Sequence, residues 1–184
     1  MLRQTFYGTL AASLLLAGAS TADAQFASPI RFNVNAGASL PVGALADNGA
    51  DGGGADLGFH VGAGLELRAP LMPVGLRFDG AYDRMGIEGF DAAWSIWHLT
   101  ANAVLSPMVS PLYFIGGVGF YSTDVTGDDV VVDSESETDF GFNLGAGLSL
   151  PLTGFSAFIE GRFHNVNVEG DDLRFVPIVF GIRF

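Results

Sequence analysis

The sequence predicts an all-β fold in which eight antiparallel strands close into an up-and-down barrel that crosses a membrane. Three observations support this prediction. Apolar residues alternate with small or polar residues along eight segments, which is the period of β-strands. The connections between these segments are alternately short and long. Finally, 49% of the residues are apolar, yet no apolar run is long enough for a membrane-spanning helix.

Composition narrows the classes of partner and of chemistry. The 184 residues include 20 acidic and 8 basic side chains, and the net charge of −12 argues against a nucleic-acid partner. All of the basic residues are arginines, and there is no cysteine. The lack of cysteine excludes a disulfide framework, a thiolate metal site, a cysteine nucleophile and a lipid anchor on cysteine.

The N-terminal segment has the three parts of a secretory signal peptide. Arg3 gives the positive start, residues 10–18 (LAASLLLAG) form the apolar stretch, and Ala22-Asp23-Ala24 is a small-x-small cleavage motif. A permanent membrane anchor is the alternative, but the apolar run is too short to cross a hydrocarbon core of about 30 Å. We therefore expect residues 1–24 to be a cleaved signal peptide and residues 25–184 to form the barrel domain.

The alternating segments are close to the roughly 9–11 residues that a tilted strand needs to cross a bilayer. They span residues 30–40, 57–67, 76–83, 97–105, 112–121, 140–150, 159–164 and 176–184. Short turns are expected at 69–73, 107–111 and 151–154, and long loops at 42–56, 85–93, 123–138 and 165–173. Outer-membrane barrels have short periplasmic turns and long extracellular loops, so we expect that orientation here.

The composition of the two strand faces decides between a membrane barrel and a soluble one. A soluble barrel would turn its apolar face inward and carry many charged residues, including lysine, on its outer face. Here the polar face holds mainly Gly, Asn and Ser, which suits the narrow interior of an eight-stranded barrel. The apolar face carries aromatic residues near strand ends, as membrane-interface belts do: Tyr82, Trp97, Phe114 and Phe184. We therefore expect the apolar face to contact lipid.

Three segments resemble a known family. Residues 175–184 (FVPIVFGIRF) end in Phe184 and are similar to the C-terminal signal that the barrel-assembly machinery reads. Residues 141–148 (GFNLGAGL) and 158–164 (FIEGRFH) resemble late strands of the eight-stranded outer-membrane β-barrel family, OmpA/OmpX-like in its barrel domain only. The resemblance implies a monomer in the outer membrane of a Gram-negative envelope, with membrane lipid and the assembly machinery as partners.

Family membership of this kind does not fix an activity, because the family includes structural anchors, adhesins, lipid-binding proteins and occasional enzymes. No peptidoglycan-binding domain follows Phe184, so we do not expect a wall-anchoring role. The sequence favours a structural or surface-interaction protein with a plugged polar lumen. The alternative is a narrow, porin-like gated pore for ions or small solutes.

The inward-facing charges form compensating sets along the strands. We expect a lumen ion-pair network that joins Glu66 with Arg68, Arg77 with Asp79 and Asp83, and Glu160 with Arg162. Small barrels are normally filled by their side chains, so a plug is favoured over a pore whose ion pairs exchange partners.

Two further groups of residues are candidate sites. His60, His98 and His164 face inward toward the extracellular end and are candidate transition-metal ligands. No close sequence spacing brings them together, so we favour hydrogen-bonded lumen histidines and expect no metal or cofactor.

The long loops are rich in acidic residues, which favours a solvated surface whose charges repel one another. The alternative there is divalent-cation binding, although the EF-hand order of ligands is missing. The loop acids are Asp124, Asp128, Asp129, Asp133, Glu135, Glu137, Asp139, Glu169, Asp171 and Asp172.

We expect no enzymatic activity. His98 and Thr100 share one face, but the serine that outer-membrane lipid deacylases use is missing at the matching spacing. Those enzymes also carry their site on the lipid side of the barrel, whereas this face points inward.

Deleting Phe184 should leave the chain in the periplasm, because the assembly signal is lost and exposed apolar strands then aggregate or are degraded. The burial of this side chain at the lipid interface should itself contribute only about 1.5–3 kcal/mol. Cell fractionation and heat-modifiable gel mobility measure location and folding. Normal outer-membrane yield with normal mobility would contradict the assembly-signal prediction.

Overall fold

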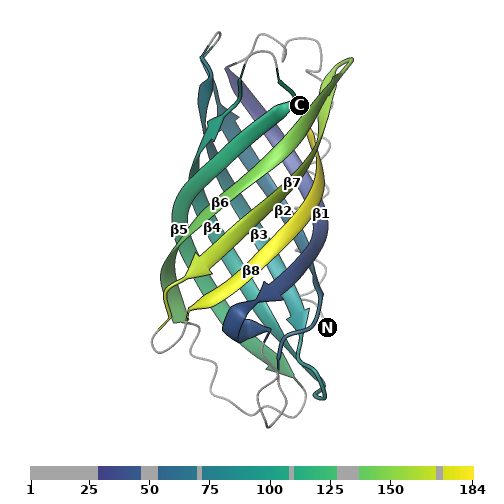
Figure 1. Ribbon diagram of the computed structural model, residues 1–184, viewed down its shortest axis with the longest axis vertical. Coiled ribbons are helices and arrows are strands. Elements are labelled where there is room, and N and C mark those ends of the chain that lie inside the picture. The colour runs from purple at the N-terminus through teal and green to yellow at the C-terminus, as the bar shows by residue number, and fades with distance from the viewer. Residues whose placement is uncertain (1–28, 47–53, 70–71, 108–109, 128–136, 169–171) are drawn as a thin grey trace, which may run out of the picture.

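The computed structural model describes residues 29–46, 54–69, 72–107, 110–127, 137–168 and 172–184. They form a closed barrel of eight antiparallel strands in sequence order, in which the last strand pairs with the first (Figure 1). This confirms the predicted fold class. The strands are β1 (Ile30–Val42), β2 (Gly58–Leu67), β3 (Val74–Gly86), β4 (Ala92–Leu105), β5 (Leu112–Gly127), β6 (Glu137–Leu152), β7 (Phe155–Val166) and β8 (Leu173–Arg183), with a short 3-10 turn η2 (Gly43–Leu45) after β1.

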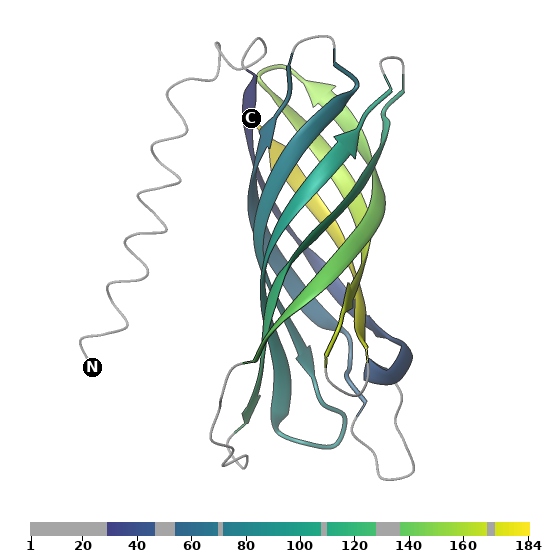
Figure 2. The ribbon, with the colours of Figure 1, turned by 90° about the vertical axis from the view of Figure 1, so that its left-hand side faces the viewer.

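The two ends of the barrel differ. The β2–β3, β4–β5 and β6–β7 connections lie at one end, together with the start of β1 and the end of β8, at the top of Figures 1 and 2; we call this the turn end. The other connections lie at the opposite end, which we call the loop end. The predicted signal peptide, residues 1–24, lies outside the described residues. The described residues contain no helix that is long and apolar enough to span a membrane.

Two loops are shorter than the sequence predicted, because the strands continue into them. β3 and β4 remain paired as far as Gly86 with Ala93, so the loop expected at 85–93 is a tight hairpin. β5 and β6 each run for 16 residues, and Ala92 pairs with Gly127. The alternation fades here because a strand beyond the bilayer no longer has one face in lipid. Its backbone pairing continues without the sequence signal on which the prediction relied.

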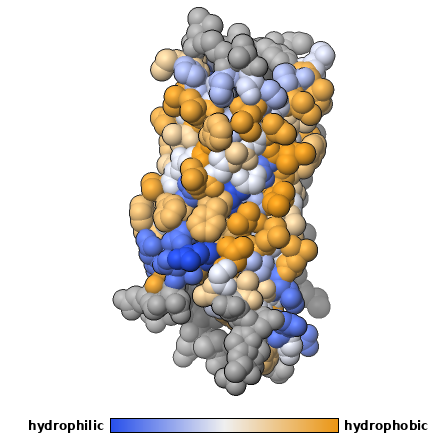
Figure 3. Space-filling view, in the orientation of Figure 1, coloured by the Kyte–Doolittle hydropathy of each residue, from blue (hydrophilic) through white to orange (hydrophobic). Residues whose placement is uncertain are grey.

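The apolar strand faces point outward, as predicted. Outward residues such as Leu99 and Phe120 are 70% and 62% exposed on the barrel wall, whereas the inward Arg77 is 1% exposed. Figure 3 shows apolar residues over much of this face of the barrel wall, with polar residues more frequent toward its ends. Such a surface requires lipid rather than water as its solvent.

Outward aromatic residues contact one another at both ends of this band. Near the loop end the rings of Tyr82 and Trp97 lie 4.6 Å apart, and at the turn end the rings of Phe32 and Phe184 lie 6.4 Å apart. Phe184 also exchanges two backbone hydrogen bonds with Phe32, at 2.8 and 2.9 Å, and so completes the pairing of β8 with β1. These positions fit aromatic girdles at two membrane interfaces.

Single cysteines can test which end faces outward, since the chain has none of its own. Asp91→Cys places a thiol at the exposed tip of the β3–β4 hairpin, and Thr153→Cys places one in the exposed β6–β7 turn. We expect an impermeant maleimide to label Asp91→Cys on intact cells, and Thr153→Cys only after the outer membrane is permeabilised. Labelling in the reverse pattern would invert the orientation.

Candidate functional site in the barrel interior

Two arginines and two carboxylates meet at the centre of the barrel. Arg77 on β3 reaches across to Glu160 on β7 in a bidentate contact, with Nη1–Oε2 at 2.9 Å and Nη2–Oε1 at 2.7 Å. Arg77 Nε also donates to Asp79 Oδ2 at 2.9 Å. Arg162 completes the set by contacting Glu160 Oε1 through Nη2 and Asp79 Oδ2 through Nη1 at 3.2 Å. The two positive charges are therefore balanced by two negative ones.

Neutral side chains add further hydrogen bonds to these carboxylates. The Tyr113 hydroxyl donates to Glu160 Oε2 at 2.8 Å, and Asn102 Nδ2 donates to Asp79 Oδ2 at 2.9 Å. Gly147 pairs with Tyr113 on one side and Glu160 on the other, and a Cβ there would collide with the tyrosine ring. The missing side chain of Gly147 therefore leaves room for the Tyr113 ring to pass across β6 and reach Glu160. We call the set Arg77, Asp79, Asn102, Tyr113, Glu160 and Arg162 the central network.

Asp83 differs from the prediction. It was expected to pair with Arg77, but its Oδ1 lies 2.9 Å from His60 Nδ1 and its Oδ2 lies 2.9 Å from His98 Nε2. The reason is distance along β3. Six residues at about 3.3 Å each separate Asp83 from Arg77 by about 20 Å, which an arginine side chain cannot span.

The three histidines converge, although nothing in their sequence spacing enforces it. The rings of His60 and His98 lie 6.1 Å apart, and those of His98 and His164 lie 5.0 Å apart. Cross-strand register explains the convergence. His60 pairs with Asp83, His98 with Tyr121, and His164 with Phe175, so these pairs form one layer around the lumen.

The histidine layer is hydrogen-bonded, but it also contains a group with metal-ligand geometry. His60 Nε2 lies 3.0 Å from Asn35 Oδ1, and His164 Nδ1 lies 2.8 Å from the Tyr121 hydroxyl. Ligand atoms of His60, Asp83 and His98 lie within 4.8 Å of one another, the one such group among the described residues. A metal ion there would have to replace both hydrogen bonds of Asp83. Hydrogen-bonded histidines therefore remain the favoured interpretation of this layer.

A third charged group lies near the turn end. Arg68 Nε donates to Glu66 Oε1 at 2.9 Å, one of the pairs predicted from the sequence, and Arg68 Nη2 donates to Ser106 Oγ at 2.9 Å. Arg183 Nε lies 3.4 Å from Glu66 Oε2. Sequence reasoning did not place Arg183 in the network. The alternation along β8 could have placed it there, because Arg183 occupies one of the inward-facing positions of that strand.

The remaining predicted positions do not form a described site. Thr100 Oγ1 accepts a hydrogen bond from Asn102, while His98 contacts Asp83, so these two residues do not pair as nucleophile and base. Among the loop acids, Asp172 pairs with Arg174 at 2.6 Å on the surface. The acids at Asp128, Asp129, Asp133, Glu135, Glu169 and Asp171 lie outside the described residues, so a divalent-cation site there stays a prediction.

Comparison with known proteins identifies the family. A sequence model of the outer membrane protein beta-barrel domain matches residues 9–184. The chain belongs to this family. It is therefore an outer-membrane β-barrel protein, as the resemblance of its late strands implied. No curated protein is similar enough in sequence to count as a match.

Solved outer-membrane barrels share the fold at low sequence identity. Neisserial surface protein A is 17% identical, with a TM-score of 0.60, over 85% of this chain and 96% of that one. Ail, the attachment invasion locus protein of Yersinia pestis, is 19% identical, with a TM-score of 0.51, over 85% and 100%. A major outer membrane protein from Thermus thermophilus is 13% identical, with a TM-score of 0.51, over 85% and 99%. These similarities concern the barrel fold alone.

Glu160→Gln should lower the free energy of unfolding by about 3–5 kcal/mol, because it leaves two buried arginines facing one carboxylate. Urea unfolding of the barrel in lipid vesicles, followed by tryptophan fluorescence, measures this loss. The control is Asp172→Asn, which breaks an ion pair whose side chains are 39% and 44% exposed and should cost less than about 1 kcal/mol.

A second variant separates charge balance from lost contacts. Combining Arg77→Gln with Glu160→Gln should cost less than the sum of the two single changes, since Arg162 and Asp79 still balance each other. Additive losses, or a Glu160→Gln variant as stable as the wild type, would contradict the role given to the central network.

Proposed function

We propose that this protein is a plugged, non-conducting outer-membrane barrel that acts as a rigid scaffold for a surface-interaction role at its loop end. The observation that carries the proposal is the contact between Arg77 and Glu160, which crosses the lumen from β3 to β7. This contact connects opposite walls of the barrel and lies across the path that a channel through the lumen would need.

The packing on both sides of this contact supports a plug. Toward the loop end, the interior holds a buried cluster that includes Met85, Ile96, Tyr121 and Phe175. Toward the turn end, a second cluster contains Val104, Tyr113, Ile115, Phe158 and Val179. The cavity between the histidine layer and the central network measures only about 10 Å³, which holds no more than about one water molecule.

The surface role rests on the form of the loop end. The β3–β4 and β5–β6 ladders continue beyond the predicted transmembrane segments, and Ser95 joins them through contacts with Tyr82 and Thr126 at 3.1 and 3.4 Å. A paired ladder holds its tip more rigidly than an unpaired loop of equal length. Together with the net charge of −12, this rigidity favours an acidic surface outside the cell that binds a partner.

Assembly and oligomeric state follow from closure of the sheet. A closed barrel has no unpaired strand edge through which copies could associate, so we propose a monomer. We also propose that Phe184 serves the barrel-assembly machinery, since its backbone completes the β8–β1 pairing and its ring faces the lipid interface beside Phe32.

The second candidate function is a narrow gated pore. One observation favours it: a cavity of about 600 Å³ opens at the turn end and extends toward the central network. Passage would require the contacts of Arg77 and Arg162 with Glu160 to open together, which would leave buried charges without partners.

Single-channel recording in planar bilayers tests the plug. We expect no steady openings from the wild-type protein, because the central network closes the lumen. The same recordings on Asp172→Asn, which changes only a surface pair, serve as the matched control. Steady wild-type openings that are abolished by substituting Arg162 or Glu66 would overturn the plug in favour of the gated pore.

A further inference from the structure

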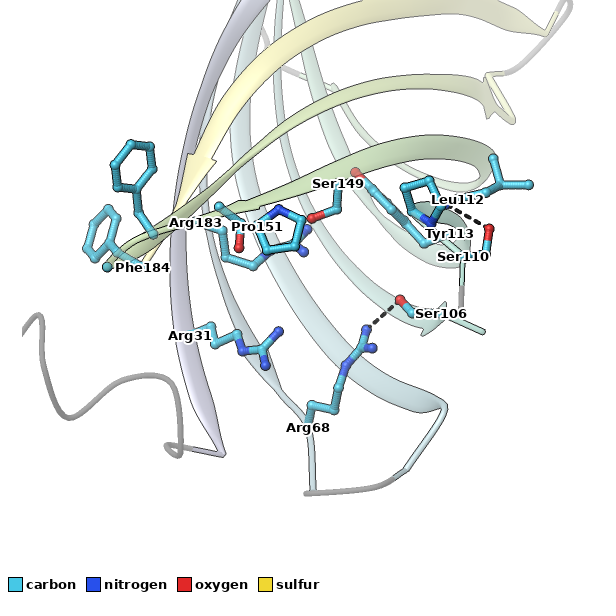
Figure 4. A pocket seen from close by; sticks show the side chains of 14 residues that line it. Arg31, Arg68, Ser106, Ser110, Leu112, Tyr113, Ser149, Pro151, Arg183 and Phe184 are labelled. Carbon is cyan, nitrogen blue, oxygen red and sulfur yellow. Dashed lines mark hydrogen bonds between the residues drawn. The ribbon is translucent and has the colours of Figure 1, made fainter. Parts of the chain in front are cut away.

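A cavity opens at the turn end, and arginines supply the charged side chains of its lining (Figure 4). Its volume of about 600 Å³ falls in the range of small-molecule sites. The charged residues that line it are Arg31, Arg68 and Arg183, and Figure 4 shows Arg31 and Arg68 pointing into it from β1 and from the end of β2. Four serines also line it: Ser106, Ser110, Ser149 and Ser156.

One carboxylate faces three guanidinium groups here. Glu66 contacts Arg68 at 2.9 Å and Arg183 at 3.4 Å, and it pairs in register with Arg31. Arg31 has no hydrogen-bond or ion-pair partner within the described residues, and the terminal carboxylate at Phe184 forms no ion pair there either. The turn residues 70–71 and 108–109 are Pro-Leu and Met-Val, so they supply no acid. The cavity therefore keeps excess positive charge in a chain that is acidic overall.

Arg183 gives an independent sign that a ligand is missing. Its side chain is 6% exposed and lies between two rings, 5.5 Å from the centroid of Tyr113 and 5.1 Å from that of Phe158. Its Nη2 atom is buried without a hydrogen-bond partner, and its Nε atom has only the 3.4 Å ion pair with Glu66 Oε2, which lacks hydrogen-bond geometry. Buried donors are normally satisfied, and leaving a charged one unsatisfied is costly. The rings hold the guanidinium in place at the wall of the cavity.

The serines add neutral donors. Ser106 Oγ accepts a hydrogen bond from Arg68, and Ser110 Oγ accepts one from the backbone N–H of Leu112 at 3.1 Å. Each hydroxyl proton is thereby left free to donate. Guanidinium forks and hydroxyl donors together are the groups that bind tetrahedral oxyanions such as phosphate.

We propose that the turn-end cavity binds a phosphate group carried by a small organic molecule. Arg31 and Arg68 bind the phosphate oxygens from the cavity wall, Arg183 supplies the buried positive charge behind them, and the serines donate to the remaining oxygens. An inorganic ion would leave most of the volume empty. Two prolines in the lining give the organic portion apolar surface to contact: Pro111 and Pro151. Tyr113 of the central network lines this cavity, and the plug proposed above would make the ligand bind and leave by the same mouth.

Glycerol 3-phosphate is the probe, titrated calorimetrically into the folded protein in maltoside micelles, which contain no phosphate. We expect saturable binding that weakens with salt. Arg31→Gln should weaken it by about tenfold or more, because that side chain offers its charge to the cavity and has no structural partner to lose. The matched control is Arg84→Gln, which makes the same charge change on an exposed residue near the loop end and should bind as the wild type does.

A second arm separates a soluble ligand from a lipid headgroup. Phosphatidylglycerol is added to the same micelles in place of the soluble probe. Arg31-dependent binding of glycerol 3-phosphate assigns the site to a soluble ligand, whereas Arg31-dependent binding of phosphatidylglycerol alone assigns it to a headgroup. Absence of saturable binding in both arms would overturn the proposal, as would equal binding by wild type and Arg31→Gln. An equal loss in Arg84→Gln would also overturn it, because net charge would then explain the effect.

Discussion

The hydrocarbon core of a membrane offers no hydrogen-bond partners, so each backbone N–H and C=O group of a strand that crosses it must be paired within the protein. The pairing of β1 with β8 meets this requirement, from Asn33 with Arg183 through Val42 with Arg174. Once the sheet is closed, alternate residues have only two environments, lipid or lumen. The apolar face must then be outside, and the polar residues are confined to a narrow interior.

That confinement explains the form of the interior. Charged side chains that face the narrow interior have little access to bulk water, so most of them pair with one another. They do so in three layers: the histidine layer toward the loop end, the central network, and the group around Glu66 toward the turn end. The same contacts that compensate for desolvation also occupy the lumen. Under the plug proposed above, stability and closure of the lumen depend on the same contacts, and a substitution that weakens one weakens the other.

The local part of this arrangement could be predicted from the sequence, and the long-range part could not. Alternation correctly indicated the number of strands and the direction of their faces, and i, i+2 spacing brought together Glu66 with Arg68 and Glu160 with Arg162. The contacts of Arg77 with Glu160 and of Arg162 with Asp79 each join residues 83 positions apart. They depend on the tilt and stagger of the whole barrel, which alternation does not encode. The same stagger places Asp83 with His60 and His98 instead of with Arg77.

Charge is also divided along the barrel axis, and this division makes the proposed plug compatible with the proposed binding cavity. The layer around Glu66 has three arginine side chains for one acidic side chain, so it carries excess positive charge. In the central network the positive and negative side chains are equal in number, so no excess charge extends further into the barrel. An anion entering from the turn end is attracted as far as Arg31 and Arg68. It gains nothing by going further, because Arg77 and Arg162 are already held by Glu160 and Asp79. Under the binding proposal, a phosphate group would therefore be retained at the mouth of the cavity. Tyr113 links the two features, because it lines the cavity and also donates a hydrogen bond to Glu160 in the network that we propose closes the lumen.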